Sequence, residues 1–237
     1  MNALVVFTSE SRFKKIGILG GMGPEATAEF YFRLIRMFQK EFGAVYDDEF
    51  PEIIIYNLPL PDVVNEKDND ILVEKALLAG ITKLKASGVD FITIPCNTVN
   101  LFINNLRRKS EMKIISIVEE TAKEVKALEI TKVGLVGTTN TINRGLYDSK
   151  LQSIEIIKPN ISQKKELKRM IINVLKGEKN MCDKKGLARI VYSLTKRGAE
   201  KVILGCTELP LICEDKSCVI DTIDVLVRST VKEAKII

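Results

Sequence analysis

Short apolar runs alternate along this chain with longer stretches in which apolar residues recur at helical spacing. In the first half the apolar runs cover residues 16–19, 53–56 and 91–95, and the helical stretches cover 24–42, 71–86 and 98–109. In the second half the runs cover 133–136, 155–157 and 201–205, and the helical stretches cover 140–151, 163–175, 183–197 and 222–235. Runs that are apolar throughout are typical of strands buried on both faces. The pattern predicts an α/β fold with mainly parallel sheets between helices.

The two halves of the chain also resemble each other. Residues 15–20 (Lys-Ile-Gly-Ile-Leu-Gly) match residues 132–137 (Lys-Val-Gly-Leu-Val-Gly), and residues 88–96 match residues 198–206 in the same order. We therefore expect two similar Rossmann-like domains with four-stranded sheets, related by a pseudo-twofold axis, with the active site in the interdomain cleft. The predicted domains are residues 1–114 with 221–237, and residues 115–220, joined near 112–116.

Composition narrows the possible partners. The net charge of +5 arises from 36 basic and 31 acidic residues spread along the chain, so we expect no nucleic-acid partner. No apolar run reaches the roughly 18 residues of a membrane span, and residues 1–13 lack the features of a signal peptide, so we expect no membrane partner. Five cysteines form an odd set without the density of a secreted scaffold, which favours the cytoplasm.

Two of the cysteines end matched strands. They lie in Pro95-Cys96-Asn97-Thr98 and in Gly205-Cys206-Thr207-Glu208. Carboxyl ends of parallel strands border the crevice of an open α/β sheet, and a helix start there lowers a thiol pKa, so we expect both thiols to exchange protons near neutral pH. The chain has no histidine, which argues against a cysteine or serine hydrolase and favours cysteines acting as both acid and base.

Other uses of the cysteines fit less well. Cys206, Cys213 and Cys218 have spacings that match no common zinc pattern, so we expect no metal site. A disulfide between Cys96 and Cys206 would need Cα atoms within about 7 Å, which a cleft that holds a substrate between them prevents.

Two loops offer groups for binding a small anion. Gly20-Gly21-Met22-Gly23-Pro24-Glu25 combines glycines with a proline suited to a first helical turn, and it predicts an anion cradle. The corresponding loop of the second half, Gly137-Thr138-Thr139-Asn140-Thr141, is rich in hydroxyl and amide groups. Neither loop has a nucleotide-binding motif. Together they would suit the two ends of a dicarboxylate.

These motifs in combination resemble the aspartate/glutamate racemase family, closest to its aspartate racemases. The resemblance rests on residues 17–24 with Ala26-Thr27, on Pro95-Cys96-Asn97-Thr98, on Gly137-Thr138 with Thr141, and on Gly205-Cys206-Thr207-Glu208-Leu209-Pro210. It implies racemisation of an acidic amino acid, aspartate or possibly glutamate, without a cofactor, by a homodimer. Cys96 and Cys206 would then be the catalytic thiolate and thiol. The substrate-binding residues that it implies are Met22, Asn97, Thr98, Val99, Thr138, Thr141, Lys176, Thr207 and Glu208.

One segment departs from the family pattern. Aspartate racemases often carry an arginine soon after the second strand, whereas residues 57–66 (Asn-Leu-Pro-Leu-Pro-Asp-Val-Val-Asn-Glu) contain none. An arginine would hold a substrate carboxylate through two parallel hydrogen bonds, and Lys67 could replace it only as a point charge. Two alternatives therefore stay open: a related isomerase acting on maleate or a hydantoin, and a non-catalytic protein that binds small carboxylates.

Overall fold

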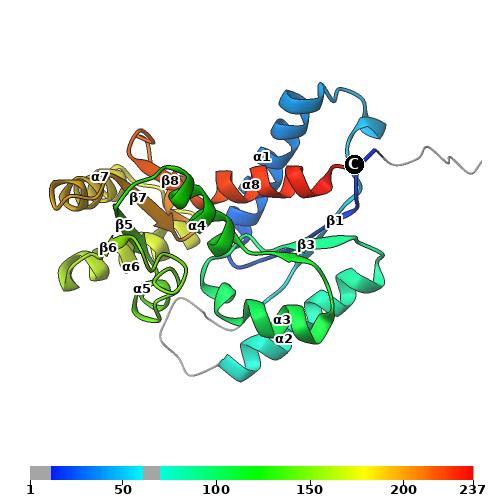
Figure 1. The fold of residues 1–237 in the computed structure, drawn as a ribbon, viewed down its shortest axis with the longest axis horizontal. Coiled ribbons are helices and arrows are strands. Elements are labelled where there is room, and N and C mark those ends of the chain that lie inside the picture. Colours follow the sequence, from blue (N-terminus) through cyan, green and yellow to red (C-terminus); the bar gives the residue numbers. More distant parts are fainter. Residues whose placement is uncertain (1–11, 61–69, 237) are drawn as a thin grey trace, which may run out of the picture.

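Two four-stranded parallel sheets form the framework of the protein (Figure 1). The computed structural model describes residues 12–60 and 70–236. The first sheet has the order β2-β1-β3-β4 and the second β6-β5-β7-β8. The strands are β1 (Ile16–Gly20), β2 (Ile53–Asn57), β3 (Phe91–Thr93), β4 (Ile114–Ile115), β5 (Lys132–Gly137), β6 (Glu155–Ile157), β7 (Lys201–Gly205) and β8 (Val219–Asp221). The α-helices are α1 (Pro24–Phe42), α2 (Asp70–Ala86), α3 (Ile103–Ser110), α4 (Ile117–Ala127), α5 (Thr139–Asn143), α6 (Ile161–Leu175), α7 (Met181–Lys196) and α8 (Thr222–Ala234).

The matched segments of the two halves occupy equal places in their sheets. β1 and β5 are each second in the strand order, and β3 and β7 are each third. All neighbouring strands are parallel, so the carboxyl ends of β3 and β7 lie at the same edge as those of β1 and β5. The predicted α/β fold with two parallel four-stranded sheets is confirmed.

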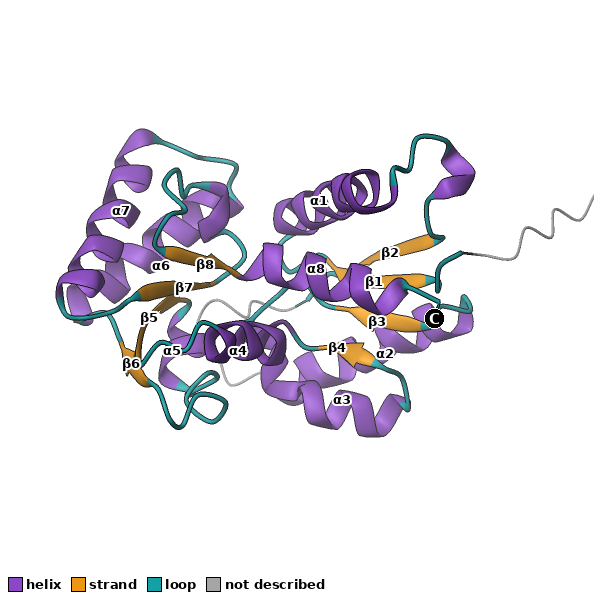
Figure 2. Ribbon diagram, turned by 45° about the horizontal axis from the view of Figure 1, so that its top comes forward, coloured by secondary structure: helices purple, strands orange, loops and turns teal. Residues whose placement is uncertain are grey.

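The core lies on both faces of each sheet, as the uniformly apolar strands require. Ile16 and Ile18 of β1 face a cluster shared with α1, α4 and α8, whereas Leu19 faces a second cluster with α2 and α3. The shared cluster also receives Val133 and Leu135 of β5, and a third cluster lies between the second sheet and helices α6 and α7. Figure 2 shows α1 and α8 on one side of the first sheet and α2 and α3 on the other.

Several elements differ from the sequence prediction. The strands β4 and β8 have only two and three residues, too few to show a pattern. The helix expected over 140–151 is wrong: α5 ends at Asn143, and Gly145 then turns the chain with φ +64°. The helix expected over 98–109 begins as a 3-10 helix, η2 (Thr98–Phe102), before α3 starts. Helix α4 directly follows the expected linker and was not predicted.

Helix α8 begins beside the second sheet and ends beside the first. Asp221 of β8 caps it by accepting hydrogen bonds from the backbone of Ile223 and Asp224. The helix packs on α1 and α4, and its last residue, Ala234, accepts a hydrogen bond from the Lys14 amide. The assignment of residues 221–237 to the first domain and the exact domain boundaries stay a proposal.

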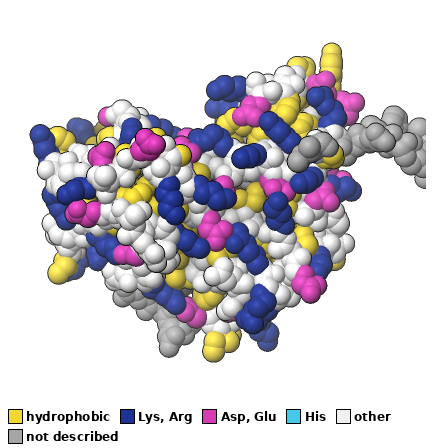
Figure 3. Space-filling view, in the orientation of Figure 1, with side chains coloured by type: hydrophobic (Ala, Val, Ile, Leu, Met, Phe, Trp, Pro, Cys, Tyr) yellow, Lys and Arg dark blue, Asp and Glu magenta, His cyan; other side chains and the backbone are white. Residues whose placement is uncertain are grey.

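Basic and acidic side chains are interspersed over the face drawn in Figure 3. Ion pairs at the protein surface include Lys109 with Glu74 and Arg228 with Glu124. Of the helices that the structure describes, none is long and apolar enough to cross a membrane.

Candidate active site

A cavity of about 170 Å³ lies between the two halves, at the carboxyl ends of their strands. Cys96 follows β3 and Cys206 follows β7, and both line this cavity. Each cysteine is 5% exposed. The cavity is lined by Gly21, Met22, Gly23, Pro24, Leu60, Cys96, Asn97, Thr98, Thr138, Leu175, Cys206, Thr207 and Glu208. The structure thus brings the two cysteines of the similar halves to one cavity.

The loop between β1 and α1 forms one wall through close backbone packing. Gly21 has φ +94°, and a Cβ there would lie 2.6 Å from the Leu58 carbonyl oxygen, so only glycine fits. Thr27 Oγ1 accepts a hydrogen bond from the Gly21 amide at 3.0 Å and donates one to the Gly23 carbonyl at 2.9 Å. The threonine of α1 therefore fixes the glycine loop over the cavity.

The Cys96 thiol is buried but lies beside backbone donors. Burial raises its pKa to about 12, while the backbone N–H groups of Val99 and Thr98 act in the opposite direction by donating to the sulfur. The Cys96 carbonyl accepts a hydrogen bond from Asn100 Nδ2 at 2.8 Å, which anchors the loop. These donors would stabilise a thiolate at Cys96 once it forms.

Cys206 has a different neighbour, the carboxylate of Glu208. Cys206 Sγ donates a hydrogen bond to Glu208 Oε2 at 2.9 Å, and the Gly23 amide donates to Glu208 Oε1 at 3.2 Å. Burial raises the pKa of Cys206 well above its usual value, and the Glu208 charge raises it further. Burial likewise raises the pKa of Glu208.

The expectation that helix starts bring these thiols toward neutral pKa values is wrong. The segments after the cysteines are the short 3-10 helices η2 and η3 (Leu209–Leu211). In both thiols the desolvation that comes with burial outweighs the backbone donors, because a thiolate loses more hydration than a thiol when water is excluded.

Three buried hydroxyl groups join the halves beside the cysteines. Thr98 Oγ1 lies 3.1 Å from Thr138 Oγ1 and 3.3 Å from Thr141 Oγ1, and the last two lie 3.0 Å apart. Thr138 also caps α5 by accepting from the Thr141 amide. Thr98 and Thr138 line the cavity, so this cluster can present hydroxyl donors to a bound carboxylate.

A second buried network holds Asn97, the residue after Cys96. Tyr147 Oη donates to Asn97 Oδ1 at 2.6 Å, and Asn97 Nδ2 donates to Thr222 Oγ1 at 3.1 Å. The Thr222 hydroxyl donates in turn to the Leu204 carbonyl at 2.9 Å, two residues before Cys206. The network connects the loop of one cysteine with the strand of the other.

Most of the residues singled out in the sequence meet at this site. Met22, Asn97, Thr98, Thr138, Thr207 and Glu208 line the cavity with the two cysteines. Val99 and Thr141 are not part of the lining but contact residues that are. The Val99 backbone N–H donates to the Cys96 sulfur, and the Thr141 hydroxyl lies 3.3 Å from Thr98 Oγ1. The segment from Pro61 to Glu66 and Lys67 lie outside the described residues.

Lys176 is not brought to the cavity. It is the exposed C-cap residue of α6, and its neighbour Leu175 lines the cavity instead. Sequence reasoning missed Leu175 and Leu60, although Leu60 lies inside the segment searched for an arginine. Within the described ranges, no group of three or more His, Cys, Asp or Glu side chains could hold a metal ion.

Comparison with known proteins decides the family. The model of the Asp/Glu/hydantoin racemase family matches residues 19–230. The chain belongs to this family. It is 31% identical over 221 residues to the broad specificity amino-acid racemase RacX of Bacillus subtilis, covering 91% of this chain and 96% of that protein. The protein is therefore an amino-acid racemase of the Asp/Glu racemase family.

Solved structures agree with this assignment of the racemase. An aspartate racemase homologue from Pyrococcus horikoshii superposes with a TM-score of 0.76 and 29% identity, covering 92% of this chain and 98% of that chain. The aspartate racemase of Picrophilus torridus superposes with a TM-score of 0.79, covering 94% of this chain and 96% of that chain. At 24% identity, this second likeness shows the shared fold alone.

Proposed function

We propose that this racemase interconverts the enantiomers of a free α-amino acid by exchanging the α-proton with the thiols of Cys96 and Cys206. The observation that carries the proposal is that both cysteines, one from each half, are buried and line one cavity. No histidine is present in the chain to serve as an alternative base.

In the proposed reaction one cysteine is a thiolate and the other a thiol. The thiolate removes the proton from Cα, and the electron pair of the broken C–H bond stays on the substrate as a carbanion. The thiol on the opposite face then donates its proton to Cα, so the two cysteines exchange protonation states. Each enantiomer is deprotonated by a different cysteine, and the pair titrates with shared apparent pKa values.

The polar lining supplies the groups that this chemistry requires. The α-proton of an amino acid is very weakly acidic, so donors around the carboxylate must stabilise the developing carbanion. The hydroxyls of Thr98, Thr138 and Thr207 and the Asn97 amide line the cavity and can fill this role. The Glu208 carboxylate is the group suited to receive the substrate ammonium.

The family resemblance also implies which substrate is racemised, namely an acidic amino acid, aspartate or glutamate. The described part of the cavity lining contains neither lysine nor arginine to pair with a side-chain carboxylate. The Bacillus subtilis relative is named as having broad specificity. Acidic and uncharged amino acids therefore both belong in the first substrate panel, together with a hydantoin and maleate.

The test is proton exchange in deuterated water. We expect deuterium to appear at Cα together with loss of optical activity, and we expect Cys96→Ser and Cys206→Ser each to abolish racemisation. The matched control is Cys182→Ser, because Cys182 is exposed and lies outside the cavity. Full racemisation by either cavity variant would refute the two-thiol reaction. Binding of amino acids without exchange would instead indicate a non-catalytic binding protein.

Three further expectations stay proposals. They are a homodimer, action without a cofactor, and a cytoplasmic location. Sedimentation velocity on the purified protein tests the first, and activity after exhaustive dialysis against a chelator, without added pyridoxal phosphate, tests the second.

A further inference from the structure

We propose that the side-chain end of the cavity is built for an uncharged aliphatic amino acid, with Leu60 and Leu175 as the residues that determine this specificity. The inference rests on the proposed racemisation at Cys96 and Cys206. It names the substrate class that the same site selects.

The cavity has an apolar part contributed by both halves. Met22 and Cys96 belong to one buried hydrophobic cluster of the first half, and the partly buried Leu60 packs against it. Leu175 comes from the end of α6 in the second half and lies over the glycine loop, since its Cδ2 would be 2.8 Å from a Cβ placed on Gly23. Met22, Leu60 and Leu175 all line the cavity. A substrate whose polar groups meet the threonines and Glu208 would therefore direct its side chain to an apolar wall.

The charge of the lining also favours an uncharged substrate side chain. Among the described lining residues, Glu208 is the only one with a charged side chain, and its carboxylate would repel an acidic side chain. A carboxylate taken from water into such a site needs a cation or several donors to replace its hydration. An aliphatic side chain has no such requirement and gains from leaving water.

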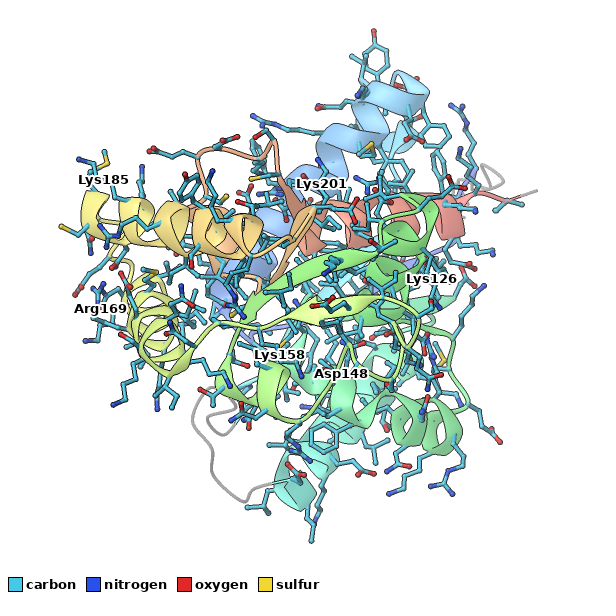
Figure 4. All side chains as sticks on the ribbon, turned by 60° about the vertical axis from the view of Figure 1, so that its left-hand side comes forward. Lys126, Asp148, Lys158, Arg169, Lys185 and Lys201 are labelled. Atoms are coloured by element: carbon cyan, nitrogen blue, oxygen red, sulfur yellow. The ribbon has the colours of Figure 1, made fainter. Side chains whose placement is uncertain are left out.

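Two basic residues on or after α6 form ion pairs with other elements. Lys179, in the loop after α6, forms an ion pair with Glu25 of α1. Arg169 of α6 pairs with Asp183 of α7 at 2.7 Å. Figure 4 shows Arg169 on the outer side of α6. Neither residue is part of the cavity lining.

The end of α6 decides which neighbour faces the cavity. Successive residues of a helix point about 100° apart, so Leu175 and Lys176 cannot share one direction. Leu175 lines the cavity at its rim, where the residue is 44% exposed, whereas Lys176, at the C-cap, is not part of the lining. The basic residue that the family resemblance implies at the site, Lys176, is thus the neighbour of the residue that lines the cavity.

The experiment measures kcat/KM for exchange of the α-proton with deuterium, over alanine, leucine, methionine, aspartate and glutamate. For the wild type we expect leucine or methionine to exceed aspartate and glutamate by about tenfold or more. Exchanging the two neighbours, in Leu175→Lys with Lys176→Leu, keeps the net charge and should raise the ratio of aspartate to leucine by about tenfold. The matched control Lys176→Leu alone, which leaves Leu175 in the lining, should keep the wild-type preference.

The outcomes separate this inference from the reaction on which it rests. Preference of the wild type for aspartate or glutamate, with exchange that needs both cysteines, would overturn the inference and leave the racemisation intact. Selective loss of aspartate exchange in Lys176→Met would also overturn it, and this variant is safe for folding because the side chain is exposed. Exchange with no amino acid of the panel would overturn the proposed racemisation, and the inference with it.

Discussion

Replacing Tyr147 by phenylalanine tests whether the buried network around Asn97 sets the position of the two cavity cysteines. The change removes one hydroxyl group from a fully buried ring and leaves the ring itself in place. That hydroxyl donates to Asn97 Oδ1 at 2.6 Å. Burial raises the pKa of Tyr147, so the phenol stays protonated and remains a donor throughout the working pH range.

The magnitude follows from what the hydroxyl leaves behind. Asn97 is 1% exposed, so water cannot easily replace the lost donor. An unsatisfied buried acceptor costs about 1–3 kcal/mol. A loss near 2 kcal/mol in a chain of this size lowers Tm by roughly 4–8 °C. If about 1.4 kcal/mol of it also appears in the activation free energy, because Asn97 and the adjoining Cys96 shift, kcat falls about tenfold.

The assay combines thermal unfolding with kcat and KM measured in both directions. We expect Tm and kcat to fall in Tyr147→Phe while KM changes by less than about twofold, because the uniform binding contacts persist. Tyr192→Phe is the matched control, since Tyr192 is 62% exposed on α7 and its ring contact with Lys196 does not need the hydroxyl. An unchanged kcat in Tyr147→Phe, with or without a lower Tm, would show that the network does not position the cysteines.

Two further predictions concern Glu208 and Gly23. Burial is the largest cause of the raised pKa of both cavity thiols, and the Glu208 charge raises each further. Glu208→Gln removes that charge, so a thiolate forms at lower pH. The acid limb of the pH profile of kcat/KM should therefore move to lower pH. A shift of this limb to higher pH would contradict the reasoning. Gly23→Ala would place a Cβ 2.8 Å from Leu175 Cδ2 and 3.0 Å from Glu208 Oε1. We expect Gly23→Ala to lower kcat/KM by about tenfold or more. Full activity would show that the loop can shift to accommodate the added methyl group.

The sheets were predictable because their strands carry a strong local signal. β1, β5 and β7 are buried almost throughout. A short, uninterrupted apolar run is typical of a strand that is covered on both faces. The strands β4 and β8 could not be predicted, since two or three residues show no period. The error over 140–151 has a local cause: Gly145 takes a left-handed conformation, and the periodicity that continues past it belongs to packed turns.

The site was predictable only in part. Cysteine, asparagine and threonine at strand ends are chemically conspicuous, so Cys96, Asn97, Thr98 and Cys206 could be singled out from their types and places. Leucines at 60 and 175 are chemically ordinary, and their role depends on which surface the fold turns toward the cavity. The same limit explains Lys176: the sequence places the end of the helix near this residue but does not show which of two neighbouring residues faces the cavity.

The duplicated halves place equivalent cysteines at one cavity but surround them differently. Cys96 has the backbone donors of Val99 and Thr98, whereas Cys206 donates to the Glu208 carboxylate. These contacts make ionisation easier at Cys96 than at Cys206, although burial raises the pKa of both thiols. Racemisation has an equilibrium constant of unity, so kcat/KM must nevertheless be equal for the two enantiomers. The asymmetry can therefore appear only as compensating differences in kcat and KM, with each enantiomer selecting the protonation state that suits it.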